Sequence, residues 1–158
     1  MKYVFAGLLL LPAMLLQGQI SDRIAPPELR PSFLFATVLL ASIFIPGKRL
    51  AFVSFLGGLL EGALCGMYLG AFIVSRTISS LVATVLMDTL HLTFPVGVFV
   101  ALVSAVVGHT IFLIIQPPSD VVWWIGTSLK QSLLTAFWVA IMYPLGRLVF
   151  GQRIPVQD

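Results

Sequence analysis

Two charged side chains interrupt a long apolar stretch, and these residues have the clearest potential for chemistry. Glu61 and Arg76 are the only charged residues between positions 50 and 87. A charge inside a lipid-spanning segment is costly and normally pairs with an opposite charge. One interpretation is a coupling, proton or ligand site, and the other, which we favour, is a structural ion pair that fixes helix register. A proton relay usually needs several acidic groups, and Glu61 is the only one expected in mid-membrane, so transport by that route is disfavoured.

The histidines and the cysteine give weaker signals. His91 is expected in a loop and His109 on a helix, hydrogen-bonded inside a helical bundle, with no carboxylate at the spacing of a metal site. Cys65 is the only cysteine, which excludes an internal disulfide, and we expect it to be a small buried side chain. No G-x-S-x-G elbow or phosphate-binding loop is present. The sequence therefore predicts no catalytic residue, no metal and no cofactor, and the protein is not expected to be an enzyme.

The composition indicates that the folded protein is surrounded by lipid. Of the 158 residues, 59% are hydrophobic and 9% are charged, and the mean hydropathy is +1.06. Soluble proteins carry roughly 25% charged residues. We therefore predict an all-α protein, a polytopic membrane helical bundle that forms a single integral membrane domain over residues 1–158. The net charge of +3 is scattered along the chain, which does not favour nucleic acid as a partner.

The apolar segments predict about six membrane spans. The N-terminal segment resembles a signal peptide, but no clear cleavage site follows it, so we expect it to remain as the first span. Trp123 and Trp124 are expected at the membrane interface, with the last span starting after them and Pro144 bending its final turns. A polar loop is expected over 17–31 and a turn over 46–49. The predicted spans are 3–16, 32–45, 50–65, 67–87, 94–115 and a last span that starts at 128–131 and ends near Arg147.

A glycine-rich segment lies at the centre of the longest apolar run. A single helix over residues 50–87 would reach about 57 Å, nearly twice the thickness of a bilayer core. The run must therefore fold back, and Gly66 is the best candidate for the turn. Gly58, Gly62, Gly66 and Gly70 recur at every fourth position. The glycines before the turn would line one helix face and let another backbone approach closely.

The basic residues predict the orientation. Six crossings place both termini on one side of the membrane, together with the loops near positions 48 and 90. That side collects most of the Lys and Arg residues near the span ends, which predicts cytoplasmic termini. These residues are Lys2, Lys48, Arg49, Arg147 and Arg153.

These features resemble the rod-shape-determining MreD family. The segment GGLLEGALCGMYLG (57–70) is similar to the family's glycine-rich G-L-L-x-D…G…L-G pattern. The segments SLLTA (132–136) and YPLGRL (143–148) are similar to its closing pattern, s-l-l-N-a…y-P-l-x-R-l, and include Thr135, Pro144 and Arg147. Glu61 stands where the family more often has aspartate, and Thr135 stands where it often has asparagine. Arg76 matches no position of the family's pattern.

The resemblance implies a non-enzymatic subunit of the bacterial cell-wall elongation (rod) complex in the cytoplasmic (inner) membrane. Such proteins regulate cell shape and pair with MreC, a single-span protein, and through it with the MreB filament, the RodA glycosyltransferase and a penicillin-binding transpeptidase. Structural or partner-contact residues would be those of the two matching segments, with Arg76 added for its charge: Gly58, Glu61, Gly62, Gly66, Gly70, Arg76, Thr135, Pro144 and Arg147.

An alternative follows from the family's fold, which is similar to that of the substrate-binding S components of energy-coupling-factor transporters. This alternative is a vitamin-binding membrane subunit. Such proteins commonly carry small residues four apart on the first span for docking to their partner. Here that span has Ala6, Gly7 and Ala13, without the spacing. A stand-alone transporter or channel has little support, because few polar groups are expected inside the membrane.

Overall fold

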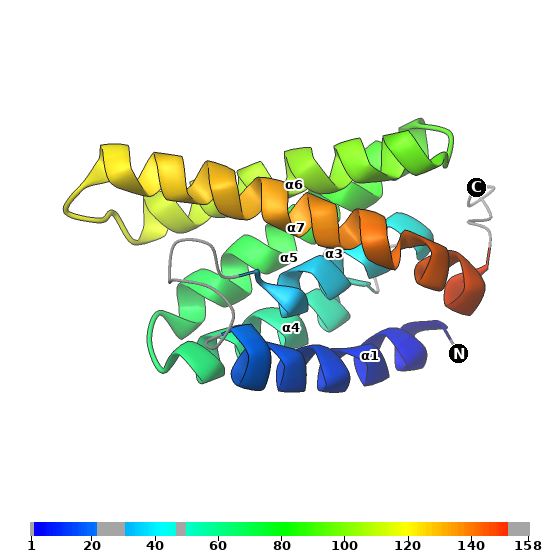
Figure 1. Cartoon of the computed structure of the whole chain (residues 1–158), viewed down its shortest axis with the longest axis horizontal. Coiled ribbons are helices and arrows are strands. Elements are labelled where there is room, and N and C mark those ends of the chain that lie inside the picture. Colours follow the sequence, from blue (N-terminus) through cyan, green and yellow to red (C-terminus); the bar gives the residue numbers. More distant parts are fainter. Residues whose placement is uncertain (1, 22–30, 47–49, 152–158) are drawn as a thin grey trace.

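The structure is a computed structural model that describes residues 2–21, 31–46 and 50–151. Within this part the regular structure is entirely helical, which confirms the all-α prediction. The described residues form six α-helices, and Figure 1 shows them gathered in one bundle. Their bounds are α1 Lys2–Leu16, α3 Phe33–Phe44, α4 Leu50–Cys65, α5 Leu69–Thr89, α6 Phe94–Ile115 and α7 Val121–Phe150, and a π-helical turn, η1 Gln17–Ser21, extends α1.

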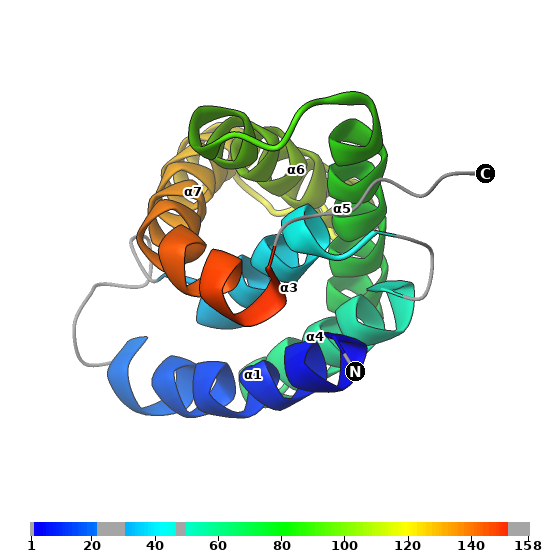
Figure 2. The ribbon, with the colours of Figure 1, turned by 90° about the vertical axis from the view of Figure 1, so that its right-hand side faces the viewer.

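The short helix α3 is the core of the bundle. All twelve of its residues are buried, and it contacts α1, α4, α5, α6 and α7. Figure 2 shows α3 inside a ring formed by the other helices. Because every face of α3 meets another helix, its sequence is apolar all round and has no polar stripe. Phe44, near its end, packs against the rings of Tyr143 and Phe150 of α7.

Three of the described helices, α5, α6 and α7, are long and apolar enough to cross a membrane. The shorter helices α1, α3 and α4 are also apolar. Helix α7 runs without a break from Val121 through Pro144 to Phe150, so the helix starts before the span expected from 128–131, and the point at which it enters the membrane stays a prediction. Asp120 caps its beginning by accepting a hydrogen bond from the Trp123 N–H at 3.0 Å.

Residues 17–21 of the polar loop expected over 17–31 are helical, because η1 continues the helix through residue 21, and residues 22–30 lie outside the described residues. Of the turn expected at 46–49, residues 47–49 lie outside the described residues.

Successive helices run between two ends of the bundle. At one end lie the end of α1, the α4–α5 turn and the α6–α7 connection, and this end is called the turn end below (Figure 1). The start of α1, the α5–α6 connection and the end of α7 lie at the opposite end (Figure 1). The arrangement brings residues from all six helices to the turn end, although they are far apart in the sequence.

The α4–α5 hairpin turns at the expected position. Helix α4 ends at Cys65, and Gly66 has a φ of 69°, in the left-handed region that glycine adopts without steric cost. Tyr68 is also left-handed, with a φ of 58°, so α5 starts at Leu69, two residues later than expected. The prediction of a hinge at Gly66 is confirmed.

Glycines let the two helices of the hairpin approach closely. A Cβ atom at Gly58 would lie 2.7 Å from Cα of Ile73, and one at Gly62 would lie 2.9 Å from Cα of Leu69. Real Cβ atoms do not approach backbone this closely, so any side chain would push α5 away. Gly70, past the turn, differs because a Cβ there would meet no atom within 4 Å.

Candidate functional site

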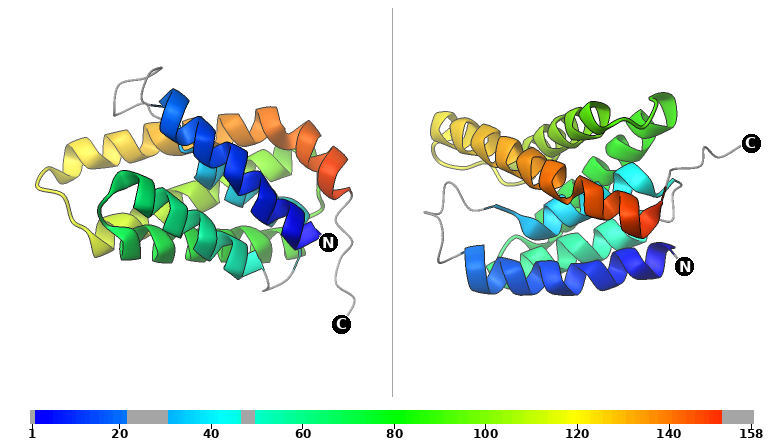
Figure 3. Two further views of the ribbon diagram at one scale, coloured as in Figure 1. Left: turned by 90° about the horizontal axis from the view of Figure 1, so that it is seen from below. Right: turned by 45° about the vertical axis from the view of Figure 1, so that its right-hand side comes forward.

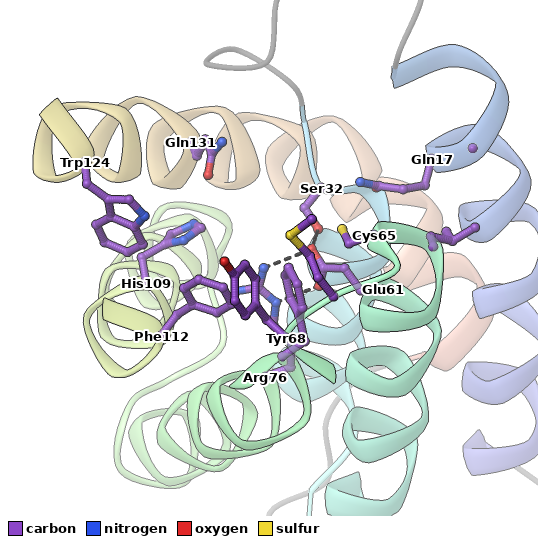
Figure 4. A pocket seen from close by; sticks show the side chains of 14 residues that line it. Gln17, Ser32, Glu61, Cys65, Tyr68, Arg76, His109, Phe112, Trp124 and Gln131 are labelled. Carbon is purple, nitrogen blue, oxygen red and sulfur yellow. Dashed lines mark hydrogen bonds and ion pairs between the residues drawn. The ribbon is translucent and has the colours of Figure 1, made fainter. Parts of the chain in front are cut away.

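Glu61 and Arg76 form a buried, two-point ion pair near the turn end. Nε of Arg76 donates to Oε2 of Glu61 at 2.7 Å, and Nη2 donates to Oε1 at 2.9 Å. The two residues are 4% and 3% exposed, respectively. The predicted pairing is therefore present (Figure 4). Two hydrogen bonds between one guanidinium and one carboxylate form a stronger pair than a single hydrogen bond does.

Helix α3 adds further contacts to this pair. The Ser32 hydroxyl donates to Oε1 of Glu61 at 2.6 Å and accepts from the backbone N–H of Phe35 at 3.2 Å, which makes Ser32 the N-cap of α3. The guanidinium carbon of Arg76 lies 3.8 Å from the centroid of the Phe35 ring, a cation–π contact. The pair therefore links α3, α4 and α5.

Two buried nitrogens beside the pair have no hydrogen-bond partner within the described part of the chain. They are Nη1 of Arg76 and Nε2 of His109. His109 is 6% exposed, so its predicted burial is confirmed, but the hydrogen bond expected for it is not found at Nε2. Its ring packs edge-on to the rings of Phe35 and Trp124. Buried polar atoms without partners are uncommon and need an explanation.

A cavity of about 620 Å³ opens at the turn end of the bundle. Arg76, His109 and Gln131 contribute polar groups to its lining, and aromatic rings form much of the rest (Figure 4). Cys65 also lines the cavity and is exposed, so its expected burial is wrong. Cys65 is the last residue of α4, next to the α4–α5 turn, which places it at the rim rather than between helices.

Aromatic rings from the ends of α5, α6 and α7 form one wall of the cavity. The rings of Phe112 and Trp124 are nearly parallel, with 6.1 Å between centroids and 5° between planes. Phe72 packs against Phe112 at 4.9 Å, and Tyr68 meets it edge-on at 6.2 Å. Trp124 lines the cavity, while Trp123 is exposed. The expectation that both lie at the membrane interface stays a prediction.

The residues of the closing pattern do not join this site. The Thr135 hydroxyl is buried and donates to the Gln131 carbonyl of its own helix at 2.8 Å, so it makes no polar contact across helices there. Pro144 and Arg147 are exposed near the opposite end of α7. Sequence reasoning missed Ser32 and Gln131, and only the position of Ser32 after a proline and before an apolar run could have indicated a cap.

The site has no preformed metal centre in the region that the structure describes, where no group of three His, Cys, Asp or Glu residues could hold an ion. Its polar groups can instead pair with one another and hydrogen-bond a small molecule. No protein-family model, curated protein or solved structure matches this chain.

Proposed function

We propose that this protein is a non-enzymatic membrane subunit of the bacterial cell-wall elongation complex, similar to MreD. One observation carries the proposal. The glycine-rich segment that resembles the family is also the segment that packs α4 on α5 and supplies Glu61 to the buried ion pair. Matching residues before the turn thus take part in the packing of the hairpin and are not an isolated pattern of small side chains.

In this proposal the chain crosses the inner membrane six times and has both termini in the cytoplasm. Helices α5, α6 and α7 have the length for this. The shorter α3 is enclosed by other helices and needs no contact with lipid. Helix α1 lies on the outside of the bundle (Figure 3), with an exposed apolar face that suits lipid or a partner helix.

The proposed role is to hold partners in place. A single-span protein like MreC would dock on the bundle and connect it indirectly to the MreB filament, RodA and a penicillin-binding transpeptidase. A scaffold of this kind needs a stiff body, and the ion pair together with the close α4–α5 packing supplies one.

The alternative of an S component has less support. The small residues Ala6 and Ala13 of α1 are buried against the rest of the bundle, so they do not present a docking surface for a transporter scaffold. The cavity at the turn end is the feature that a ligand-binding subunit would need. It does not by itself separate the two functions, because a scaffold can also hold a small molecule.

Depletion of the protein in its own bacterium tests the proposal. We expect depleted cells to lose their rod shape and widen, and the wild-type gene supplied in trans to restore the shape. A variant with Lys130→Gln, an exposed residue of α7, should restore it equally well. Normal shape after depletion, with loss of uptake of a vitamin, would contradict the proposal and favour the alternative.

A further inference from the structure

The cavity at the turn end combines features of a binding site that the proposed scaffold role does not use. Nη1 of Arg76 and Nε2 of His109 both belong to its lining residues and have no hydrogen-bond partner in the described structure. Both side chains are more than nine-tenths buried. Because an unmade hydrogen bond in a buried site costs free energy, a ligand that supplies the missing partner would be favoured.

The charges around the cavity select an uncharged ligand. Among the described residues, Glu61 and Arg76 are the only Asp, Glu, Lys or Arg residues that line it, and the ion pair already neutralises both. An added carboxylate or ammonium group would therefore lose its hydration without meeting an unpaired opposite charge. A carbonyl oxygen can accept from Nη1 of Arg76 without that penalty.

The wall of the cavity favours a planar group. The nearly parallel rings of Phe112 and Trp124 offer an extended aromatic surface close to the polar end. Aromatic surfaces of this kind stack on other planar rings. The volume of about 620 Å³ lies within the range of small-molecule sites, roughly 300–1,000 Å³.

We propose that this cavity binds a small, uncharged molecule that has a planar ring and a carbonyl acceptor, of the amide or lactam class. The carbonyl accepts a hydrogen bond from Nη1 of Arg76, Nε2 of His109 makes a second hydrogen bond, and the ring packs on Phe112 and Trp124. The inference concerns this site alone and does not depend on the proposed role in cell-wall elongation.

Benzamide is a suitable probe, because it is small, planar, neutral and soluble. We would measure its binding to the purified full-length protein in detergent through the fluorescence of Trp124, in a variant with Trp123→Phe and Trp138→Phe. Trp124 is then the only tryptophan of the chain. We expect a saturable response, at least tenfold weaker binding of benzoate, which adds a charge, and weaker binding of cyclohexanecarboxamide, which lacks the planar ring.

Two variants test the location of the probe. His109→Phe keeps a ring and removes the nitrogens, and Leu64→Trp, at a partly exposed position of the lining, fills the cavity from its rim. The second variant carries an added tryptophan, so its binding is read from the benzamide-induced shift in melting temperature. We expect each variant to weaken benzamide binding at least tenfold, and the exposed Thr110→Val on the same helix to leave it unchanged.

Several results would overturn the inference. These are a response to benzamide that does not saturate, benzoate binding as tightly as benzamide, or benzamide binding that survives both cavity variants. Complete displacement of benzamide by added phosphatidylglycerol would identify the occupant as a lipid and would also reject the small-molecule assignment.

Discussion

Breaking the Glu61–Arg76 pair one residue at a time should cost more than removing it whole. Glu61→Gln leaves the guanidinium in a buried position with no carboxylate. Arg76→Gln removes two of the three hydrogen bonds that the carboxylate accepts and leaves the one from the Ser32 hydroxyl. Removing one partner of a buried pair costs about 3–5 kcal/mol. We expect a loss of that size in the free energy of unfolding for each single variant.

The double variant should recover much of this loss. It contains no unpaired charge, and the remaining penalty includes the cation–π contact between Arg76 and Phe35, about 0.5–2 kcal/mol. The coupling energy is the difference between the sum of the two single-variant losses and the double-variant loss in free energy of unfolding. If the double variant loses no more than one single variant, this difference is about 3 kcal/mol or more. That value lies at the upper end of what contacting residues show.

The assay is unfolding of the purified protein in mixed micelles, followed by far-ultraviolet circular dichroism as the denaturing detergent fraction rises. Lys130→Gln removes an exposed charge and serves as the control, with an expected change within about 0.5 kcal/mol. Losses that simply add in the double variant would show that Glu61 and Arg76 do not interact. The packing of α4 on α5 described above would then be wrong.

Further predictions concern the glycines and the topology. Gly58→Ala should destabilise the protein by about 1–3 kcal/mol in the same unfolding assay, because the added Cβ meets the backbone of α5. Gly70→Ala should be neutral or stabilising by up to about 1 kcal/mol, because its Cβ meets no atom. Equal effects of the two variants would refute the close approach of α4 and α5. Gly66→Val should lower the yield of folded protein because of its positive φ, and Gly126→Val, which faces open space, should not; equal yields would argue against the turn. A reporter active only in the periplasm should be silent when fused after residue 158 or at 48 and active near 26, and activity at the C-terminus would exclude the six-span topology.

The helix ranges were the most predictable part of the fold. The predicted spans over 32–45, 50–65 and 94–115 agree with α3, α4 and α6 to within one residue at each end. Each is an apolar run bounded by proline, glycine or polar residues, which local rules can locate. The hinge at Gly66 was predictable for a related reason, because a run of that length cannot cross a bilayer once.

The start of α7 was not predictable from its composition. The 30 residues from Val121 to Phe150 are too many for one upright crossing, so the last span was predicted to begin at 128–131. The helix instead starts at Val121, because Asp120 supplies a cap and the polar side chains of Lys130 and Gln131 do not disturb backbone hydrogen bonding. Gln131 lines the cavity, where a polar side chain needs no lipid contact.

The candidate site was predictable only in its ion pair. Two isolated opposite charges in one apolar hairpin have few other partners, so the pairing of Glu61 and Arg76 could be inferred from the sequence. The cavity could not, because it is formed where the ends of separate helices meet, and no local pattern records how Trp124 and His109 converge.

The most direct test of the proposed function is to identify what the protein binds in its own membrane. The full-length protein with a C-terminal tag would be cross-linked in cells, solubilised in mild detergent and purified, and its partners identified by mass spectrometry against a tagged, unrelated polytopic protein. We expect a single-span protein with a periplasmic domain, recovered in near-equal amount. Recovery of an ATPase-linked membrane scaffold in its place would contradict the proposed function.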